Sequence, residues 1–337
     1  MPKTGVLLIN LGTPNSPTKR DVYPYLTQFL NDPRVIDVPW LKRKLLVNGI
    51  IIPFRIANST KIYKELWTEE GSPLLLYGNE LRDVLQQELG SNFGVHLGMR
   101  YQNPSLEKVL GEMQKMNYEK IIIVPLFPQY ASSSTGSAVE KAMNILKKWW
   151  VIPELSIISQ YWDDEGYINT IIERSKEFDL KEYGHFIFSY HGLPDRQVDK
   201  VHLDGRSCKE HKCYTEINQE NQFCYRATCY ATTRLLAEKL GLKEEDYTVA
   251  FQSRLNNRWL DPFSDHVVKQ KAKQGVKKLL VFSPAFVADC LETTVEIGLE
   301  YDELFQENGG EKLDLVKSLN VHPMWVQALK KMVHERA

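Results

Sequence analysis

The sequence contains one supersecondary pattern twice, and this repeat limits the folds that the chain can adopt. In each copy a short apolar run leads to an arginine-bearing turn, an amphipathic segment follows, and a second apolar run ends at a proline. In the first copy Arg100 precedes Pro125 by 25 residues. In the second copy Arg254 precedes Pro284 by 30 residues. Continuous apolar runs are typical of parallel strands that helices cover on both faces. The repeat therefore predicts an α/β fold of two similar, Rossmann-like doubly wound parallel-sheet domains.

Each half also has an apolar run that indicates a first buried strand, at residues 5–10 and at residues 185–190. With 337 residues the chain is long for one hydrophobic core. We expect two domains, residues 1–170 and residues 171–337. The turns after parallel strands gather at one edge of a sheet, where open α/β sheets bind their ligands. We therefore expect the active site among these turns, in a central cleft that the two halves share.

Composition and charge argue against several classes of protein. Hydrophobic residues make up 43% and charged residues 25% of the chain, as in an ordinary globular protein. The formal net charge of −1 provides no general attraction for nucleic acid. The apolar run near the N-terminus is about five residues long, too short for the apolar part of a signal peptide or for a membrane span. A cytoplasmic protein is therefore expected.

Residues 21–67 are unusually rich in apolar and aromatic side chains and include the basic residues Lys42, Arg43, Lys44 and Arg55. Ordinary core packing would account for many of the apolar residues. The alternative is an exposed apolar and basic lip that rests on a membrane surface or receives a flat hydrophobic ligand.

A row of carboxylates follows the strand predicted at residues 279–283. Glu292, Glu296 and Glu300 are four residues apart, so a helix places them on one face. Asp289 is predicted to cap this helix, with Glu292 at the capping-box position. Like charges at this spacing repel one another, so the row is either a solvated surface or a path for a cation. Its place just after the carboxyl end of a strand favours the path.

Two further turns carry candidate functional groups. His191 follows the strand at residues 185–190 and precedes Gly192. An imidazole that is partly removed from water there would be neutral near pH 7 and able to accept a proton; a purely structural histidine is the common alternative. A run of serine and threonine at residues 132–137 opens a helix, and it either caps that helix or forms an anion cradle from backbone N–H groups.

Four of the five cysteines lie within 22 residues, in the pattern C-x4-C-x10-C-x4-C. They are Cys208, Cys213, Cys224 and Cys229. The surrounding residues 204–229 are largely polar and lack a regular period, as expected for an inserted loop. In a cytoplasmic protein such cysteines are more often thiols or metal ligands than disulfides. Four thiolates can hold a tetrahedral zinc ion or a [2Fe–2S] cluster, and this spacing permits both.

Several separate motifs resemble those of the ferrochelatases, the terminal enzymes of haem synthesis. They are SYHGLP at residues 189–194, FQSR at 251–254 with Trp259, ADCLET at 288–293 continuing to Glu300 and Tyr301, NLGTP at 10–14, MRY at 99–101, and Gln129 and Tyr130 with the serine and threonine loop that follows. These matches span nearly the whole chain. The resemblance implies the chelatase fold, in which two Rossmann-like halves hold a porphyrin between them. It also implies insertion of Fe²⁺ into protoporphyrin IX to form protohaem, without a nucleotide or redox cofactor.

The resemblance also assigns roles to individual residues. His191 and Glu292 match the family's catalytic histidine and glutamate, and Glu296 and Glu300 match an acidic path for the substrate iron. Contacts with that iron are therefore expected from these four residues. Porphyrin contacts are expected from Leu11, Arg100, Tyr101, Tyr130, Ser253 and Trp259. The lip at residues 21–67 corresponds to a membrane-facing mouth, which implies a peripheral membrane contact.

Two residues depart from the pattern of other ferrochelatases. Leu11 stands where members that use coproporphyrin tend to have tyrosine, which favours protoporphyrin here. Cys290 stands where other members have histidine, so no metal role is assigned to this side chain. The internal cysteines resemble those of a bacterial subset that binds a [2Fe–2S] cluster. We expect this cluster on Cys208, Cys213, Cys224 and Cys229, with zinc as the alternative.

Other functions are compatible with the sequence. Carboxylates and one imidazole discriminate poorly among divalent metals, so a chelatase for cobalt or nickel, or for a more carboxylated tetrapyrrole such as coproporphyrin, is an alternative. A non-catalytic haem carrier is another. No nucleic-acid partner is expected, and the sequence predicts no particular oligomeric state.

Overall fold

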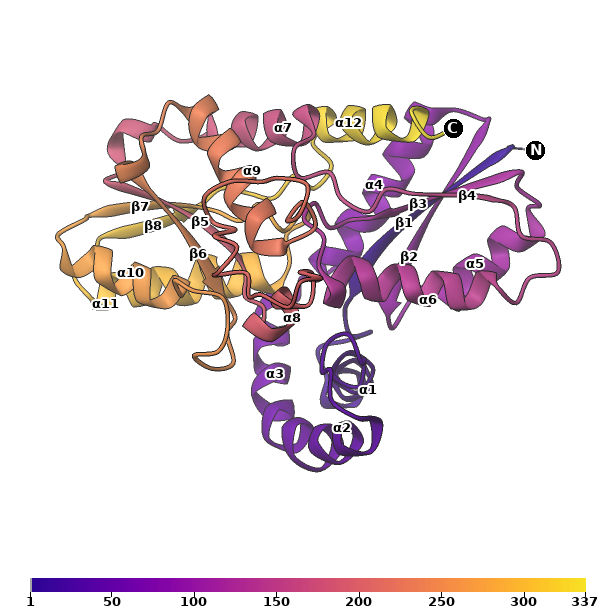
Figure 1. Ribbon diagram of the computed structural model, residues 1–337, viewed down its shortest axis with the longest axis horizontal. Helices are drawn as coiled ribbons and strands as arrows, with labels where there is room; N and C mark the ends of the chain where they lie inside the picture. Colours follow the sequence, from indigo (N-terminus) through magenta and orange to yellow (C-terminus); the bar gives the residue numbers. More distant parts are fainter. Residues whose placement is uncertain (1) are drawn as a thin grey trace. The chain divides into compact units, whose positions relative to one another are not determined.

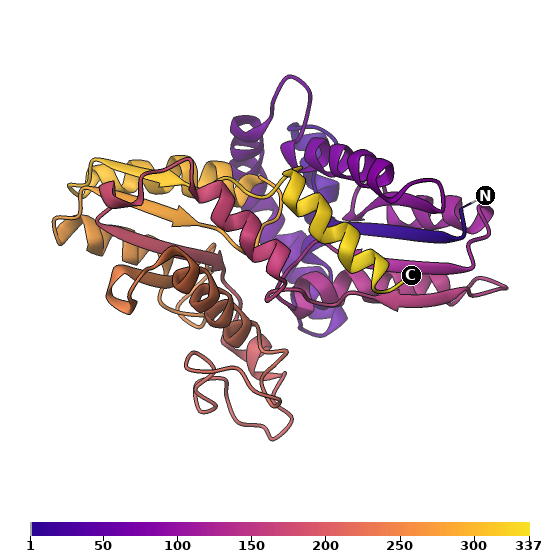
Figure 2. The same cartoon turned by 90° about the horizontal axis from the view of Figure 1, so that it is seen from above.

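The computed structural model describes residues 2–337, and the chain forms two compact units (Figure 1, Figure 2). The first unit comprises Met1–Phe127, Ser132–Gln160 and Val326–Ala337; the second comprises Pro128–Ala131 and Tyr161–Trp325. The main part of the second unit thus begins before the boundary predicted at residue 170, and the C-terminal residues return to the first unit.

The first unit is built on a parallel four-stranded sheet with the strand order β2-β1-β3-β4. The strands are β1 (Thr4–Gly12), β2 (Phe93–Tyr101), β3 (Lys120–Pro125) and β4 (Glu154–Ile157). Helices cover both faces: α4 (Pro73–Leu89) lies on one, and α5 (Leu106–Lys115) and α6 (Ser137–Leu146) lie on the other. Leu97 of β2 packs over Gly78 of α4, while the next residue, Gly98, leaves room for Leu106 of α5. This two-sided burial explains why the strands are continuous apolar runs.

The second unit repeats this arrangement with the strand order β6-β5-β7-β8. The strands are β5 (His185–His191), β6 (Tyr247–Gln252), β7 (Lys278–Phe282) and β8 (Lys312–Leu315). The helical elements are α7 (Glu165–Ser175), η3 (Leu180–Glu182), α8 (Asp195–Asp199), α9 (Tyr225–Leu240), η4 (Glu244–Asp246), α10 (Ser264–Lys273), η5 (Leu291–Tyr301) and α11 (Asp302–Glu307). The last helix, α12 (Pro323–His334), continues into the first unit. In the first sheet β1 lies between β2 and β3, and in the second sheet β5 lies between β6 and β7. This equivalence confirms the predicted repeat and the α/β class.

The apolar segment near the N-terminus is helical. It consists of α1 (Lys19–Leu30), α2 (Trp40–Leu46), the short π-helical η1 (Val47–Ile51) and α3 (Ile52–Leu66), which project from the sheet of the first unit (Figure 1). Part of the segment is core, since Val22 and Ile52 are buried. The other part is an exposed lip whose large apolar side chains are more than half accessible: Trp40, Leu41, Leu45, Ile50 and Phe54. Among the described residues, no helix is both long and apolar enough to cross a bilayer.

The predicted inserted segment lies between α8 and α9. Residues 200–224, all of which the structure describes, form only turns and loops. The segment extends from the second unit beside the beginning of α9 (Figure 2). Because α9 begins at Tyr225, Cys229 belongs to the helix and not to the loop.

Candidate active site

His191 is the last residue of β5 and pairs with Gln252, the last residue of β6. The following residue, Gly192, donates its N–H to the carbonyl oxygen of Gln252 at 2.8 Å. A Cβ at Gly192 would lie 2.8 Å from that oxygen, so only glycine allows this close approach. Nδ1 of the half-buried His191 lies 2.7 Å from the Gly192 carbonyl oxygen. Because a carbonyl only accepts, Nδ1 carries the hydrogen, and in the neutral form of the ring the lone pair is then on Nε2.

The carboxylate row lies on η5, an 11-residue π-helix that follows β7. The predicted helix is present, but its turns are wider than α-helical turns because its hydrogen bonds span five residues. The predicted cap is wrong: Cys290 is the N-cap, and its N–H donates to the Thr293 hydroxyl at 2.9 Å. The Asp289 carboxylate instead accepts from the Ser318 N–H at 3.0 Å and from Nδ2 of Asn320 at 2.7 Å. Through these two hydrogen bonds Asp289 connects the start of η5 to the loop that follows β8.

The three carboxylates of the row differ in exposure. Glu292 and Glu296 are half-buried, whereas Glu300 is exposed. The row therefore runs from the edge of the sheet toward the surface. Cys290 lies beside Glu292; its burial above all, and then the charge of that carboxylate, raise the pKa of the Cys290 thiol well above its ordinary value. A thiol that stays protonated near pH 7 is a poor metal ligand.

Glu296 is held by four hydrogen-bond donors. Its carboxylate accepts from the Ser253 N–H at 2.9 Å, the Ser253 hydroxyl at 2.5 Å, Nε2 of Gln252 at 3.0 Å and the Tyr301 hydroxyl at 3.0 Å. Ser253 has a φ of 59°, a left-handed conformation that is uncommon for a residue with a side chain. This conformation directs both donors of Ser253 to the carboxylate, so Glu296 has a single, fixed position.

Gln252 joins the histidine to the acidic row. Its backbone pairs with His191, and its side-chain amide donates to the Glu292 carbonyl oxygen at 2.9 Å as well as to Glu296. Its amide oxygen accepts from the Ser189 hydroxyl at 2.8 Å. Gln252 thus links the backbones of His191 and Glu292 and the carboxylate of Glu296 at the end of β6. No role was predicted for Gln252, although an amide at the buried end of an apolar strand is a signal that it has polar partners.

Besides Ser253, two more of the predicted porphyrin contacts lie in the second unit. The ring of Trp259 is 3.4 Å from the position of a Cβ at Gly192, and its backbone forms a bridge with Pro194. Trp259 is therefore next to His191. Tyr130 packs edge-on against Phe223 of the cysteine segment, with the ring centroids 6.1 Å apart.

Two of the predicted contacts in the first unit, Arg100 and Tyr101, bind a buried carboxylate. Asp32 forms an ion pair with Arg100 and accepts hydrogen bonds from the hydroxyls of Tyr101 at 2.8 Å and Ser137 at 2.5 Å. Burial raises the pKa of Asp32, but hydrogen bonds, led by that from Ser137, and the charge of Arg100 outweigh burial and hold the pKa below its ordinary value. Tyr101 is only 1% exposed, so it packs inside this unit. Leu11 is half-buried near the end of β1.

The serine and threonine run forms the short π-helical η2 (Ser132–Gly136) and the start of α6. The Ser132 hydroxyl accepts from Arg34 at 2.9 Å, and the Ser137 hydroxyl donates to Asp32. At least two hydroxyls of the run therefore make contacts within the first unit.

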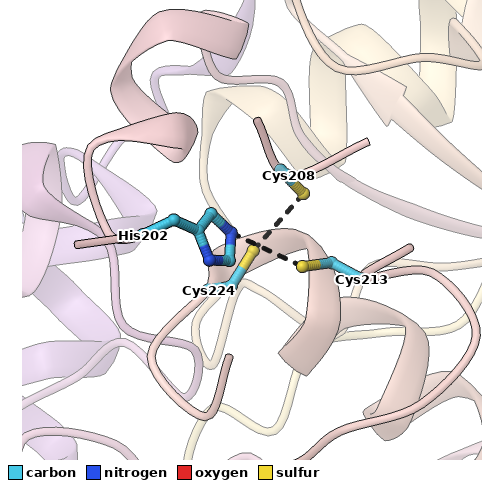
Figure 3. Close-up of side chains that lie close together, drawn as sticks. All are labelled: His202, Cys208, Cys213 and Cys224. Carbon is cyan, nitrogen blue, oxygen red and sulfur yellow. Dashed lines mark hydrogen bonds between the residues drawn. The ribbon is translucent and has the colours of Figure 1, made fainter. Parts of the chain in front are cut away.

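A separate group of metal-ligand side chains lies in the cysteine segment (Figure 3). One ring nitrogen of His202 and the thiols of Cys208, Cys213 and Cys224 all lie within 4.8 Å of one another, and the four residues are buried. The fourth predicted ligand, Cys229, lies on α9 outside this group. His202 was not among the predicted ligands. The available signal was a histidine close in sequence to the first cysteine, as in mixed cysteine and histidine metal sites.

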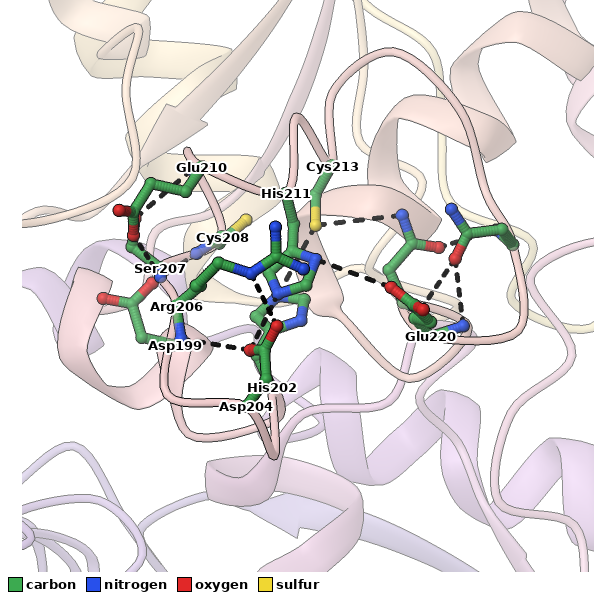
Figure 4. A network of polar contacts seen from close by, with 12 residues as sticks. Asp199, His202, Asp204, Arg206, Ser207, Cys208, Glu210, His211, Cys213 and Glu220 are labelled. Atoms are coloured by element: carbon green, nitrogen blue, oxygen red, sulfur yellow. Dashed lines mark hydrogen bonds and ion pairs between the residues drawn. The ribbon is translucent and has the colours of Figure 1, made fainter.

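Polar contacts hold the loop around this group (Figure 4). The Cys208 N–H donates to the Asp199 carboxylate at 2.8 Å, and Nδ2 of Asn221 lies 3.8 Å from the Cys213 sulfur. The imidazole of His211 stacks on that of His202 with the ring centroids 4.1 Å apart. The residues that could bind a metal are therefore fixed by partners of their own.

Comparisons with known proteins agree with this geometry. A family model described as Ferrochelatase matches residues 3–337. A ferrochelatase from Coxiella burnetii (strain Dugway 5J108-111) is 44% identical over 335 residues, which cover 98% of this chain and 93% of that protein. A ferrochelatase from Legionella pneumophila subsp. pneumophila (strain Philadelphia 1) is 42% identical, with 99% of both chains covered. Among solved structures, SirB from Bacillus subtilis with Fe3+ shares the fold, with a TM-score of 0.56 at 13% identity over 99% of this chain and 96% of that chain. The chain therefore belongs to the ferrochelatase family.

Proposed function

We propose that this protein inserts Fe²⁺ into protoporphyrin IX to form protohaem, the last step of haem synthesis. Family membership supports metal insertion into a tetrapyrrole. The observation that carries the proposal is the set of contacts of Gln252, which pairs with the backbone of His191 and donates to the backbone carbonyl of Glu292 and to the carboxylate of Glu296. The reaction releases two pyrrole protons as the hydrated cation exchanges its water molecules for the four ring nitrogens. It therefore needs a proton acceptor beside a group that binds the cation.

His191 supplies the proton acceptor. Its Nδ1–H is engaged by the Gly192 carbonyl, so Nε2 presents a lone pair. The hydrogen bond also fixes the ring plane, which keeps the acceptor in place while a pyrrole proton is transferred. The neighbouring Trp259 offers a flat apolar surface on which the macrocycle can lie.

The η5 carboxylates supply the path for iron. Glu300 is exposed and can capture the hydrated cation, and Glu292 is the half-buried carboxylate at the inner end of the row. Oxygen ligands of this kind replace water on a divalent cation. Glu296 has the different role of holding the row to β6, because its carboxylate is already occupied by four donors.

An anaerobic insertion assay tests this function. His191→Ala should lower kcat about a hundredfold or more, because it removes the proton acceptor, while porphyrin binding measured by fluorescence quenching is retained. Glu292→Gln should also abolish most turnover. Glu303→Gln is the matched control, because it removes an exposed carboxylate from α11, next to η5. Full activity of Glu292→Gln would show that the Glu292 carboxylate does not bind the cation.

The same assay separates the alternatives. A non-catalytic haem carrier would show no turnover in the wild type and unchanged haem affinity in His191→Ala. Coproporphyrin carries more carboxylates than protoporphyrin, and the apolar Leu11 offers no hydrogen bond to an added one. A preference for coproporphyrin over protoporphyrin would overturn the proposed substrate, and faster insertion of Co²⁺ than of Fe²⁺ would overturn the proposed metal.

We also propose that the lip of α1, α2, η1 and α3 makes a peripheral contact with a membrane surface. The exposed side chains of Trp40, Leu45 and Phe54 support this, because scattered single apolar residues would not form such a group. Lys42 and Lys44 add positive charge beside them, which favours anionic lipid. The cytoplasmic location stays a prediction from the sequence.

The cysteine segment is proposed to hold a metal centre of its own. The convergence of Cys208, Cys213 and Cys224 supports this, since buried thiols gathered in an irregular loop are typical of metal sites. The [2Fe–2S] cluster stays a prediction, and its predicted ligand set includes Cys229 as the fourth thiolate. Cys229 is not a member of the group that comes together, so the zinc alternative gains support.

A further inference from the structure

We infer that His202 is the fourth ligand of a single-metal site with Cys208, Cys213 and Cys224, and that this site takes one zinc-like divalent cation. Cys229 is then a buried thiol of α9 and not a ligand. The inference does not depend on the proposed insertion activity. It rests on the placement of the four ligand atoms, on their burial, and on the loop that carries them (Figure 3).

The spacing of the ligand atoms fits one metal ion. The sulfur atoms of Cys208 and Cys224 are 3.5 Å apart, and the Cys213 sulfur is 3.5 Å from Nε2 of His202. A tetrahedral ion with metal–sulfur bonds of about 2.3 Å and a metal–nitrogen bond of about 2.0 Å places its ligand atoms roughly 3.5 to 3.8 Å apart. The observed group needs only small adjustments to reach this geometry.

The same spacing disfavours a two-iron cluster. Such a cluster divides its four ligands between two iron atoms, so the two ligand pairs must be separated by the additional distance between the irons. Here all four ligand atoms lie within 4.8 Å of one another. Cys229, the fourth thiolate of the predicted cluster, lies on α9 in contact with the side chain of Tyr225.

His202 has the surroundings of a ligand. The residue is 5% exposed, and its Nε2 faces the Cys213 sulfur. Its other ring nitrogen has no hydrogen-bond partner in the part of the chain that the structure describes. A metal bond at Nε2 would replace the weak sulfur contact there, while the N–H on Nδ1 would still lack a partner among the described residues. The ring is held in plane by the stacked His211, whose Nε2 is 3.0 Å from the Asp204 carboxylate (Figure 4).

The loop itself needs a crosslink. Residues 200–224 form only turns and loops, and Leu203 is fully exposed. A polar loop of this length buries too little apolar surface to offset its conformational entropy. Four converging ligands on one ion would hold it, as metals do in other small segments without a large core.

The crosslink would also support the candidate active site. Cys224 is the N-cap of α9, and the next residue, Tyr225, donates its hydroxyl to the His191 carbonyl oxygen at 3.0 Å. Phe223 packs against Tyr130. The metal would therefore hold the beginning of α9 against the residue that ends β5.

Metal content of anaerobically purified protein tests the inference. We expect a colourless wild type with about one zinc per chain by mass spectrometry and no acid-labile sulfide. Replacement of zinc by Co²⁺ should give the visible absorption of a tetrahedral thiolate site. Two irons and labile sulfide in each chain would overturn the single-metal site, as would a protein that binds neither zinc nor Co²⁺.

Variants decide which residue is the fourth ligand. His202→Ala should weaken zinc at least tenfold in competition with a chelator, whereas Cys229→Ser should keep the wild-type affinity. His211→Ala is the matched control, because it removes the neighbouring ring and leaves all four ligands. If His202→Ala fails to fold, His202→Cys provides the test: it should keep one metal and strengthen the thiolate-to-cobalt absorption. Loss of metal from Cys229→Ser together with retention in His202→Ala would overturn the ligand assignment.

Discussion

At the scale of residues, Glu296 shows how a charged side chain acquires a role from its surroundings. Its spacing from Glu292 and Glu300 indicates three equivalent carboxylates, but the contacts make them different. Glu296 is tied down by Ser253, Gln252 and Tyr301, whereas Glu300 lies at the surface. A carboxylate that accepts from four hydrogen-bond donors is held in one position. The row therefore contains one carboxylate fixed by four donors, and its members are not equivalent.

His185, the first residue of β5, leads to a prediction about stability and pH. Burial above all, and then the charge of Lys271, lower the pKa of His185 from 6.5 to about 4, although Asp246 opposes the shift. Above its unfolded pKa the histidine is neutral in both states and contributes no pH dependence. As the pH falls from about 6.5 to about 4, the unfolded chain binds a proton that the folded chain does not, so stability is lost, by up to about 3 kcal/mol.

Urea unfolding over this pH range checks the prediction. Nε2 of His185 lies 2.9 Å from the Thr248 hydroxyl. His185→Gln keeps a polar group near that hydroxyl but does not titrate. The midpoint of the wild type should fall more steeply with decreasing pH than that of the variant. Parallel curves would show that His185 is not the group responsible.

At the scale of elements, η5 shows the difference between predicting a helix and predicting its form. The acidic and apolar period indicates a helix after β7, and a helix is present. Its start at Cys290 depends on partners elsewhere, because the Asp289 carboxylate accepts from Ser318 and Asn320. An aspartate that is held by distant residues is not available to cap the helix beside it.

The lip gives a prediction for a whole element. The triple variant Trp40→Ser, Leu45→Ser and Phe54→Ser should bind anionic phospholipid vesicles at least tenfold more weakly in co-sedimentation, because each exposed side chain contributes apolar area to the contact. Binding by the wild type should also weaken in high salt, since Lys42 and Lys44 would be screened.

Exposed apolar residues outside the lip provide the matched control for that experiment. Trp150, Val151 and Leu255 are each more than half exposed, as are the three lip residues. Replacing these three by serine should leave vesicle binding unchanged. Equal losses in both triple variants would contradict a specific role for the lip.

At the scale of the whole molecule, the two units have separate hydrophobic cores. Leu110 lies in a buried cluster between β1, β3, α5 and α6, and Leu279 lies in one between β7, α10 and η5. Each of these leucines is fully buried. Leu110→Ala and Leu279→Ala should each cost about 2 to 5 kcal/mol of stability in the unit concerned.

Hydrogen exchange followed by mass spectrometry distinguishes the two units. Leu110→Ala should speed exchange mainly in β1 and β3, and Leu279→Ala mainly in β5 and β7, because local opening follows the stability of the surrounding core. A uniform increase over both sheets in either variant would show that the units open only together.

By itself the sequence determined the repeated α/β architecture, because buried parallel strands and their covering helices leave local, periodic patterns of apolar residues. The sequence motifs also indicated the family, and they located the histidine at the end of β5 and the row of glutamates. For residues 21–67 the sequence left two interpretations, ordinary core or an exposed lip. Tertiary structure alone decided which donors bind the Glu296 carboxylate and which bind the Asp289 carboxylate. It also decided that His202 lies with three of the cysteines, while Cys229 lies outside that group. These contacts join residues far apart in the chain or within an irregular loop. Their geometry depends on how the strands and turns are assembled, and no local pattern of residues encodes it.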